Sequence, residues 1–223
     1  MRRVFVSAAL LCLLSPALLG GEPVDRVFIR PWVELEPLVR IDAGPYPIPV
    51  DAAEKKLLEE ARVLLSGMVY GWTFSYIPGD RARHVEQSFT LTPVAQIPWG
   101  SPRLSVLETE VVDQKLWARI SYSMTGDEQD RRTSWESNTA LLSTGRGTAP
   151  TSLGPPGKMA SVQDAIRDAI RLGLDTRWVN KPRQVEGDVV LWDDPQTTVR
   201  SGAYTTVAKV KILVRELVPY RIY

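Results

Sequence analysis

The spacing of apolar and polar residues changes period several times along the chain, and each change marks a predicted element. Between residues 51 and 68 apolar side chains recur at the three- and four-residue spacing of one helical face. Asp51, with Glu54 three residues later, has the form of a capping box, and Gly67 would end the helix. Lys56 and Glu60 are spaced for an i,i+4 ion pair on its polar face.

A period of two follows at once and predicts a β-hairpin. Tyr70, Trp72, Phe74 and Tyr76 alternate with smaller residues, so this aromatic row shares one face of a strand that we expect to pack under the first helix. The segment at residues 78–80, Pro-Gly-Asp, is a turn signal. The return strand would place His84, the chain's one histidine, on its opposite, polar face.

Further alternation predicts more antiparallel strands. A second strand pair opens at Leu104 and Val106, can turn at residues 113–115, and alternates again from Leu116 to Met124. The charged stretch "TGDEQDRR" reads as a loop, and residues 133–139 read as another strand with Trp135 on one face. Later, residues 185–192 and 203–217 alternate cleanly, joined by the turn-like connection "DDPQTTVRSG".

The remaining segments complete the domain plan. Residues 1–21 have a basic start and a short apolar run, the layout of a cleaved signal peptide, with an uncleaved anchor as the alternative. Residues 22–50 form a proline-rich extended arm, which we expect to lie on the fold as one or two edge strands rather than to form a free linker. Residues 51–142 hold the first helix and its strands, and residues 143–157 read as a Gly/Pro loop. Residues 158–223 hold a second helix, about Met159 to Leu172, and a β-hairpin.

These elements predict an α+β fold in which antiparallel sheet, as one sheet or two, packs against two amphipathic helices. Whether residues 51–142 and 158–223 form one domain or two small lobes stays open. At 223 residues and 44% hydrophobic content the chain can bury a sizeable core without crosslinks.

Charge and cysteine content exclude several classes of protein. The formal charge is +1 and would become −1 once Arg2 and Arg3 leave with the signal peptide, and no long run of one sign remains. A nucleic-acid surface is therefore not expected. Cys12 lies inside the apolar leader, with Leu11 before it, so lipid attachment there is disfavoured. The mature chain would then have no cysteine and no membrane-spanning segment.

Motifs for catalysis are missing from the sequence. It contains no phosphate-binding P-loop, no dinucleotide-binding glycine pattern, no zinc-protease motif and no nucleophile elbow. His84 reads as a solvated residue near a strand end. The acidic residues Asp127, Glu128, Asp130, Asp193 and Asp194 read as loop charges rather than as an acid–base pair. We therefore expect no catalytic residue, no metal ligand and no cofactor.

Tryptophan is the residue type that points to binding. The chain has seven, and two of them fall at positions that could be exposed. Trp117 lies on the polar face of the strand whose other face carries Leu116 and Ile120, and Trp99 lies in the loop "QIPWGSP". Both are candidate binding residues; the alternative is that they pack under a loop or under the N-terminal arm.

The last third of the chain also resembles a known family. The segments "MASVQDAIRDAIRLGL", "VEGDVVLWDD" and "GAYTTVAKVKILVREL" place a helix before two strands. This arrangement is similar to the small helix-hairpin domains of bacterial envelope proteins, such as the N-terminal domain of flagellar assembly T-protein. The resemblance implies a helix packed on strands and a structural role at or near the envelope. It implies no particular site residue.

Three functional hypotheses follow. The first is a non-enzymatic exported protein, periplasmic or envelope-associated, that acts as an interaction or scaffold module. It would contact another envelope protein through an exposed sheet edge, the 143–157 segment or the proline-rich arm. The second is a periplasmic binder of small ligands or glycans that uses Trp99 and Trp117. The third, a hydrolase built on acidic residues, has the least support. The sequence leaves the oligomeric state open.

Overall fold

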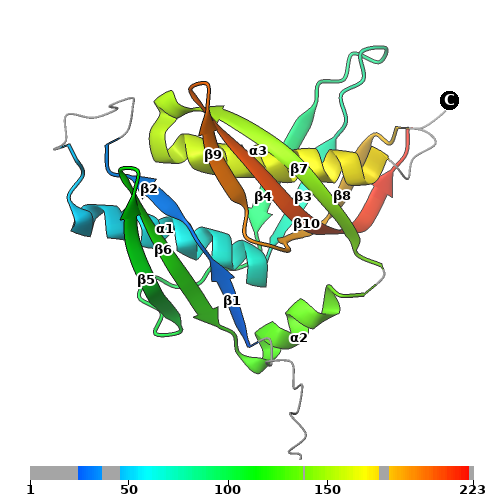
Figure 1. The fold of residues 1–223 in the computed structure, drawn as a ribbon. Coiled ribbons are helices and arrows are strands. Elements are labelled where there is room, and N and C mark those ends of the chain that lie inside the picture. The colour runs from blue at the N-terminus through cyan, green and yellow to red at the C-terminus, as the bar shows by residue number, and fades with distance from the viewer. Residues whose placement is uncertain (1–24, 37–45, 138, 176–180, 221–223) are drawn as a thin grey trace, which may run out of the picture.

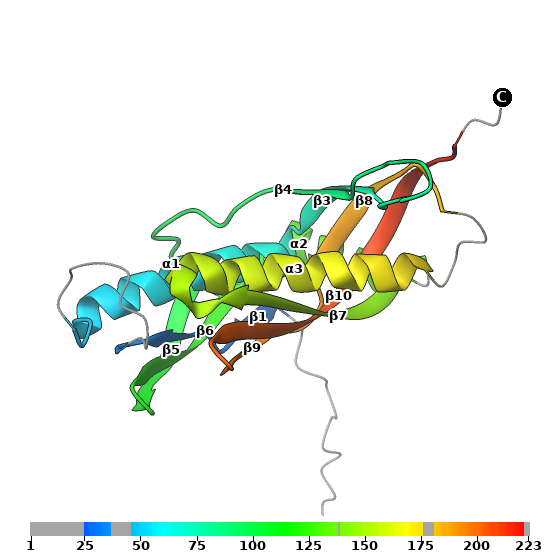
Figure 2. The same cartoon turned by 90° about the horizontal axis from the view of Figure 1, so that it is seen from above.

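The computed structural model describes residues 25–36, 46–137, 139–175 and 181–220 (Figures 1 and 2). Residues 1–21, for which we predicted a signal peptide, lie outside this part of the chain. The described residues form two sheets. Sheet A contains β1 (Arg26–Ile29), β2 (Trp32–Glu34), β5 (Leu104–Val112) and β6 (Lys115–Ser123). Sheet B contains β3 (Trp72–Ile77), β4 (Ser88–Pro93), β7 (Leu141–Pro150), β8 (Gln184–Leu191), β9 (Gln196–Arg200) and β10 (Ala203–Val218).

Strand β6 is the centre of sheet A. It pairs with β5 along one edge and with β1 and β2 along the other, all antiparallel. The β5–β6 turn is made by Asp113 and Gln114, both with positive φ, as a two-residue hairpin requires. The strands β1 and β2 lie within residues 22–50 and pair with β6 along one edge. The tip of the β5–β6 hairpin projects from the body of the molecule (Figure 2).

Sheet B joins the two halves of the chain. The predicted hairpin of the first half is present as β3 and β4, and β3 pairs with β8 from the second half. Strand β10 pairs with β8, β9 and β7. The predicted connection between residues 192 and 202 contains strand β9, which was not predicted because the turn-forming residues there indicated a connection. Because one sheet contains strands from both halves, the two halves do not form separate lobes, and the expected α+β character is confirmed.

The segment 143–157 is not a loop, and that prediction was wrong. Its first part is strand β7, and helix α3 (Gly154–Asp175) begins directly after a short 3-10 turn (Thr151–Leu153). The glycines serve close packing instead: a Cβ on Gly145 or Gly147 would overlap the backbone of α3. Helix α3 therefore lies directly against β7 and β10, covering one face of sheet B (Figure 1).

Helix α1 (Val50–Val69) packs against sheet A and also reaches β8. The predicted apolar stripe is buried, including Leu57, Leu64 and Leu65. The predicted capping box is absent, because Pro49 occupies the N-cap position without a side-chain cap. Gly67 does not end the helix; it makes room for the ring of Trp72, and a Cβ there would overlap that ring.

The aromatic row lies partly under a different helix from the one expected. Phe74 and Tyr76 are buried, at 3% and 4% exposure. Burial raises the pKa of Tyr76, and the neighbouring Asp175 carboxylate at the end of α3 raises it further. The Tyr76 end of the row therefore lies near the end of α3, and Trp72 is the member that contacts α1 through Gly67.

A third helix replaces a predicted loop and strand. Helix α2 (Gly126–Ser134) begins with a capping box in which Thr125 and Glu128 bond each other's backbone N–H groups. Trp135 is its C-cap and is buried, so the strand expected over residues 133–139 does not exist as predicted. No helix in the described ranges is long and apolar enough to cross a membrane.

Candidate functional site

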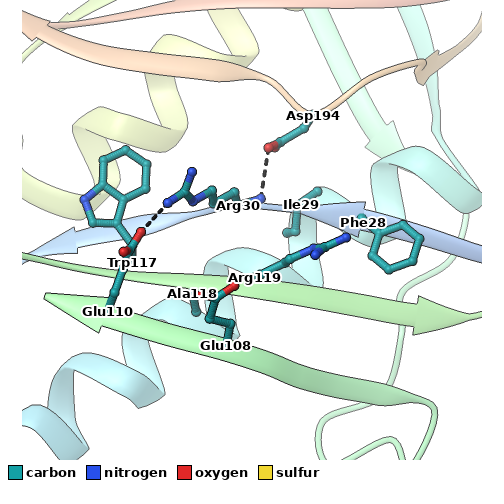
Figure 3. A pocket seen from close by; sticks show the side chains of 9 residues that line it. All are labelled: Phe28, Ile29, Arg30, Glu108, Glu110, Trp117, Ala118, Arg119 and Asp194. Atoms are coloured by element: carbon teal, nitrogen blue, oxygen red, sulfur yellow. Dashed lines mark hydrogen bonds and ion pairs between the residues drawn. The ribbon is translucent and has the colours of Figure 1, made fainter. Parts of the chain in front are cut away.

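An open cleft of about 400 Å³ lies on the outer face of sheet A, between β1, β5 and β6 and the β8–β9 connection. Figure 3 shows its lining, which we call the Trp117 cleft: Phe28, Ile29, Arg30, Glu108, Glu110, Trp117, Ala118, Arg119 and Asp194. Alternation along the strands puts the side chains of Phe28, Trp117 and Arg119 on the face opposite α1, whereas those of Ile29, Ala118 and Ile120 turn inward and are buried. Trp117 thus lies on the outer face, as its position in the sequence predicted.

Two arginine–aromatic pairs stand at the two ends of the cleft. The Arg30 guanidinium lies 5.5 Å from the ring centroid of Trp117, and that of Arg119 lies 5.5 Å from the ring centroid of Phe28. Phe28 is 42% exposed, whereas its strand neighbours Val27 and Ile29 are buried. Such pairs present flat apolar surface and charge together, which suits recognition of a mixed apolar and polar partner.

Carboxylates complete the charge pattern of the cleft. Glu110 forms an ion pair with Arg30, and the backbone N–H of Arg30 donates to Asp194 Oδ2 at 2.9 Å (Figure 3). Burial raises the pKa of Asp194, and this hydrogen bond acts in the opposite direction. Glu108 stands opposite Arg119 in the β5–β6 register. The cleft therefore offers both signs of charge within a short span.

The aromatic lining continues inward through Trp32. Its ring centroid lies 5.9 Å from that of Trp117 and 6.4 Å from that of Tyr204 on β10. The Trp32 indole Nε1 donates to the carbonyl oxygen of Thr197 on β9 at 3.1 Å. This ring is 4% exposed and connects sheet A to sheet B. The position of Trp117 is therefore fixed by a stack that runs into the core.

A buried lysine holds the inner end of this stack. Lys158, in the first turns of α3, is 5% exposed and bonds Glu60 Oε1 at 2.7 Å and the Trp32 carbonyl oxygen at 2.6 Å. Its ammonium nitrogen also lies 4.0 Å from the Trp32 ring centroid. Burial lowers the pKa of Lys158, and the Glu60 carboxylate acts against that shift. Glu60 therefore pairs with Lys158, and the surface pair expected with Lys56 was wrong.

We expect Lys158→Met to lower the free energy of unfolding by about 3 kcal/mol, because it leaves the Glu60 carboxylate buried without its cation. The double variant Lys158→Met/Glu60→Leu should recover most of that loss, since no unpaired charge remains. Urea unfolding followed by tryptophan fluorescence measures both. Equal stability of the single variant and the unaltered protein would show that this buried pair does not hold α3 against α1.

Trp99 is exposed but lies in a different place from Trp117. It is 54% exposed and lines an apolar groove of about 270 Å³. A second hollow of about 310 Å³ shares Leu58 and Val106 with the first. We call the two together the α1–β5 groove. It lies on the inner face of sheet A, so the two predicted binding residues do not form one site.

The predicted solvated carboxylates differ in their surroundings. Glu128 is buried at 7% exposure and accepts hydrogen bonds from Tyr70, Tyr122, Arg103 and the Thr125 backbone. Burial acts to raise its pKa, but these bonds outweigh it and lower the pKa to about 2. The prediction that Glu128 is a loop charge was therefore wrong.

The other charged candidates are closer to expectation. Asp127, Asp130 and Asp193 are exposed, and Asp193 pairs with Lys209 at 2.9 Å. His84 is exposed, as predicted, but it lies in the turn before β4 with φ of 54° rather than in the strand. No group of three or more His, Cys, Asp and Glu side chains within the described ranges is placed to hold a metal ion.

Sequence reasoning missed most of the cleft. Alternation along β6 located Trp117, and the same rule applied to β1 would have placed Phe28 and Arg30 on one face. Asp194 carried no such signal, because it reaches the cleft from a connection 164 residues away in the chain. Lys158 also carried none, since its helical position predicts neither burial nor contact with β2.

The fold and the cleft together define an α+β protein with two antiparallel sheets and an open surface site. A protein-family model matches residues 22–220, and the chain belongs to that family. A relative from Treponema pallidum (strain Nichols), described as an uncharacterised protein, is 28% identical over 192 residues, which cover 86% of this chain and 81% of the relative. No solved structure matches the chain.

Proposed function

We propose that this protein is a non-enzymatic module of the cell envelope, exported by its predicted signal peptide, that binds another envelope protein through the Trp117 cleft. The observation that carries the proposal is the pair of arginine–aromatic contacts at the ends of the cleft, Arg30 with Trp117 and Arg119 with Phe28. Tryptophan and arginine are over-represented among the residues that dominate the energy of protein–protein interfaces.

The state of the carboxylates supports a binding role over a catalytic one. Glu110 is held by Arg30, and Glu128 is fully engaged by its own chain. Asp194 accepts from the Arg30 backbone and from Gln196. A general acid or base must reach a substrate, whereas these carboxylates form ion pairs and hydrogen bonds with neighbouring segments of the same chain. Their arrangement favours a preformed contact surface.

The test is recovery of a partner from native envelopes with an affinity-tagged chain and mild crosslinking. We expect Arg119→Ala to reduce recovery of the crosslinked partner about tenfold, because it removes the exposed arginine of the Arg119–Phe28 pair without disturbing the core. Arg81→Ala, in the turn before β4, is the control for the loss of an exposed arginine. Recovery that is insensitive to Arg119→Ala, or the absence of any crosslinked protein, would contradict the proposal.

Glycan binding is a second candidate, favoured by one observation. The half-buried Trp117 ring lies beside the Glu110 carboxylate and the Arg30 guanidinium, a combination that can stack on a sugar ring and bond its hydroxyl groups. Tryptophan fluorescence titration with soluble peptidoglycan fragments tests this. A saturable change that Trp117→Phe weakens would favour it, and no change at millimolar concentration would rule it out.

A further inference from the structure

We propose that strand β5 receives an extended segment of the partner protein as an additional strand of sheet A. We further infer the chemistry of that segment: apolar residues on the face toward the α1–β5 groove, alternating with basic residues on the face toward the Trp117 cleft. This inference rests on the proposed function, because it describes how the same sheet would hold its partner. Addition of a strand to a sheet edge is an established mode of peptide recognition.

The backbone of β5 has free hydrogen-bonding groups along its outer edge. Thr109 stands opposite Ala118 on β6, and the Ala118 N–H donates to Pro31 on the far side at 3.1 Å. The pair Thr109–Ala118 is therefore not hydrogen-bonded, so the N–H and C=O of Thr109 point away from the sheet. By the same alternation those of Val111 do too. Neither residue's outward groups have a hydrogen-bond partner in the described part of the chain.

One edge strand of sheet B, β7, is closed, in contrast to the open edge of β5. On β7 the outward N–H groups of Arg146 and Thr148 donate to Asp168 at 3.0 Å and Asp164 at 3.1 Å, both on α3. Side chains that occupy outward N–H groups prevent another strand from pairing there. No such cap covers β5 in the described residues. A register irregularity at Leu107 limits the regular part of its edge to residues 108–112.

The apolar face of the incoming segment follows from the exposure of β5. Val106 and Val111 are 46% and 57% exposed, although they lie on the face that turns toward α1. Next to them the α1–β5 groove presents Leu58 and, at one end, Trp99. Apolar side chains at alternate positions of an added strand would cover this surface and remove it from water.

The basic face follows from the order of charges across sheet A. The outermost strand contributes Glu108 and Glu110 to the Trp117 cleft, and the inner strands contribute Arg119 and Arg30. A strand added outside β5 would face the two glutamates, so lysine or arginine there continues the alternation of charge. Pairing of β5 with β5 of a second copy would place these glutamates near one another, which disfavours self-association.

The probe is a fluorescein-labelled nine-residue peptide of alternating valine and lysine, measured by fluorescence anisotropy with the full chain. We expect saturable binding that Thr109→Pro weakens about tenfold, because proline removes the outward N–H while leaving the bonds to β6 in place. Thr109→Val keeps that N–H and should bind within about twofold of the unaltered protein. The matching valine–glutamate peptide should not bind.

Two further measurements keep the result decisive. If Thr109→Pro fails to fold, two sets of N-methylated peptides replace it, one methylated at the odd-numbered residues and one at the even-numbered residues. The set whose methyl groups face β5 should abolish binding, and the other set should not. Equal binding by both sets, or no binding of the valine–lysine peptide at millimolar concentration, would overturn the added strand. Partner recovery that Arg119→Ala reduces but Thr109→Pro leaves unchanged would also overturn it, while the proposed function would stand.

Discussion

At pH 7, Glu128→Gln is expected to lower the free energy of unfolding by about 3 kcal/mol. The lowered pKa of Glu128, about 2 against an ordinary value of 4.5, means that the folded protein stabilises the ionised carboxylate by roughly that amount. A glutamine has nearly the same shape but cannot accept from Tyr70, Tyr122 and Arg103 together. Its amide NH₂ would face donors and leave them unpaired.

The pH dependence of this loss gives a second, independent readout. A carboxyl group with a lowered folded-state pKa contributes stability that is complete above its unfolded value and disappears as pH falls. The difference between the unaltered protein and Glu128→Gln should therefore be constant above about pH 5 and shrink toward zero as the pH approaches about 2. Urea unfolding at several pH values measures it. A difference that does not change with pH would mean that Glu128 is not ionised in the buried network.

Gly147→Ala is expected to destabilise the protein by about 3 kcal/mol or more. The added Cβ would overlap the backbone of Ser161 and Ala165, so α3 would have to move away from β7. Gly126→Ala is a matched control, because a Cβ there, at the start of α2, meets no atom within 4 Å. We expect that control to stay within about 1 kcal/mol of the unaltered protein. Equal stability of the two variants would contradict direct contact between α3 and β7.

Patterns that repeat along the sequence predicted the fold correctly, whereas residues whose role depends on packing against a distant element did not. The apolar stripe of α1 and the alternation along β6 repeat over many residues, and both predicted the correct element and the correct face. Gly145 and Gly147 misled the prediction because glycine favours loops and also permits close approach of a helix to a strand. A single sequence cannot distinguish these two uses without knowing that α3 lies above.

The candidate site was predictable only in part, for a similar reason. Trp117 could be placed on an outer face by local alternation, and the Thr125–Glu128 spacing is a capping-box signal that could have located α2. The contact of Asp194 with Arg30 and the burial of Lys158 against Trp32 join segments more than a hundred residues apart. Such contacts depend on how the two sheets meet, and no local pattern encodes that.

Site-specific photocrosslinking shows whether the Trp117 cleft faces a protein partner in the envelope. Benzoylphenylalanine at position 28 keeps an aromatic ring in the cleft, and the same group at position 92 lies on an exposed residue of sheet B. Irradiation of intact cells should give a crosslinked species of one defined mass from position 28 and none from position 92. Crosslinking that is equal at both positions, or absent at position 28, would contradict the proposed function.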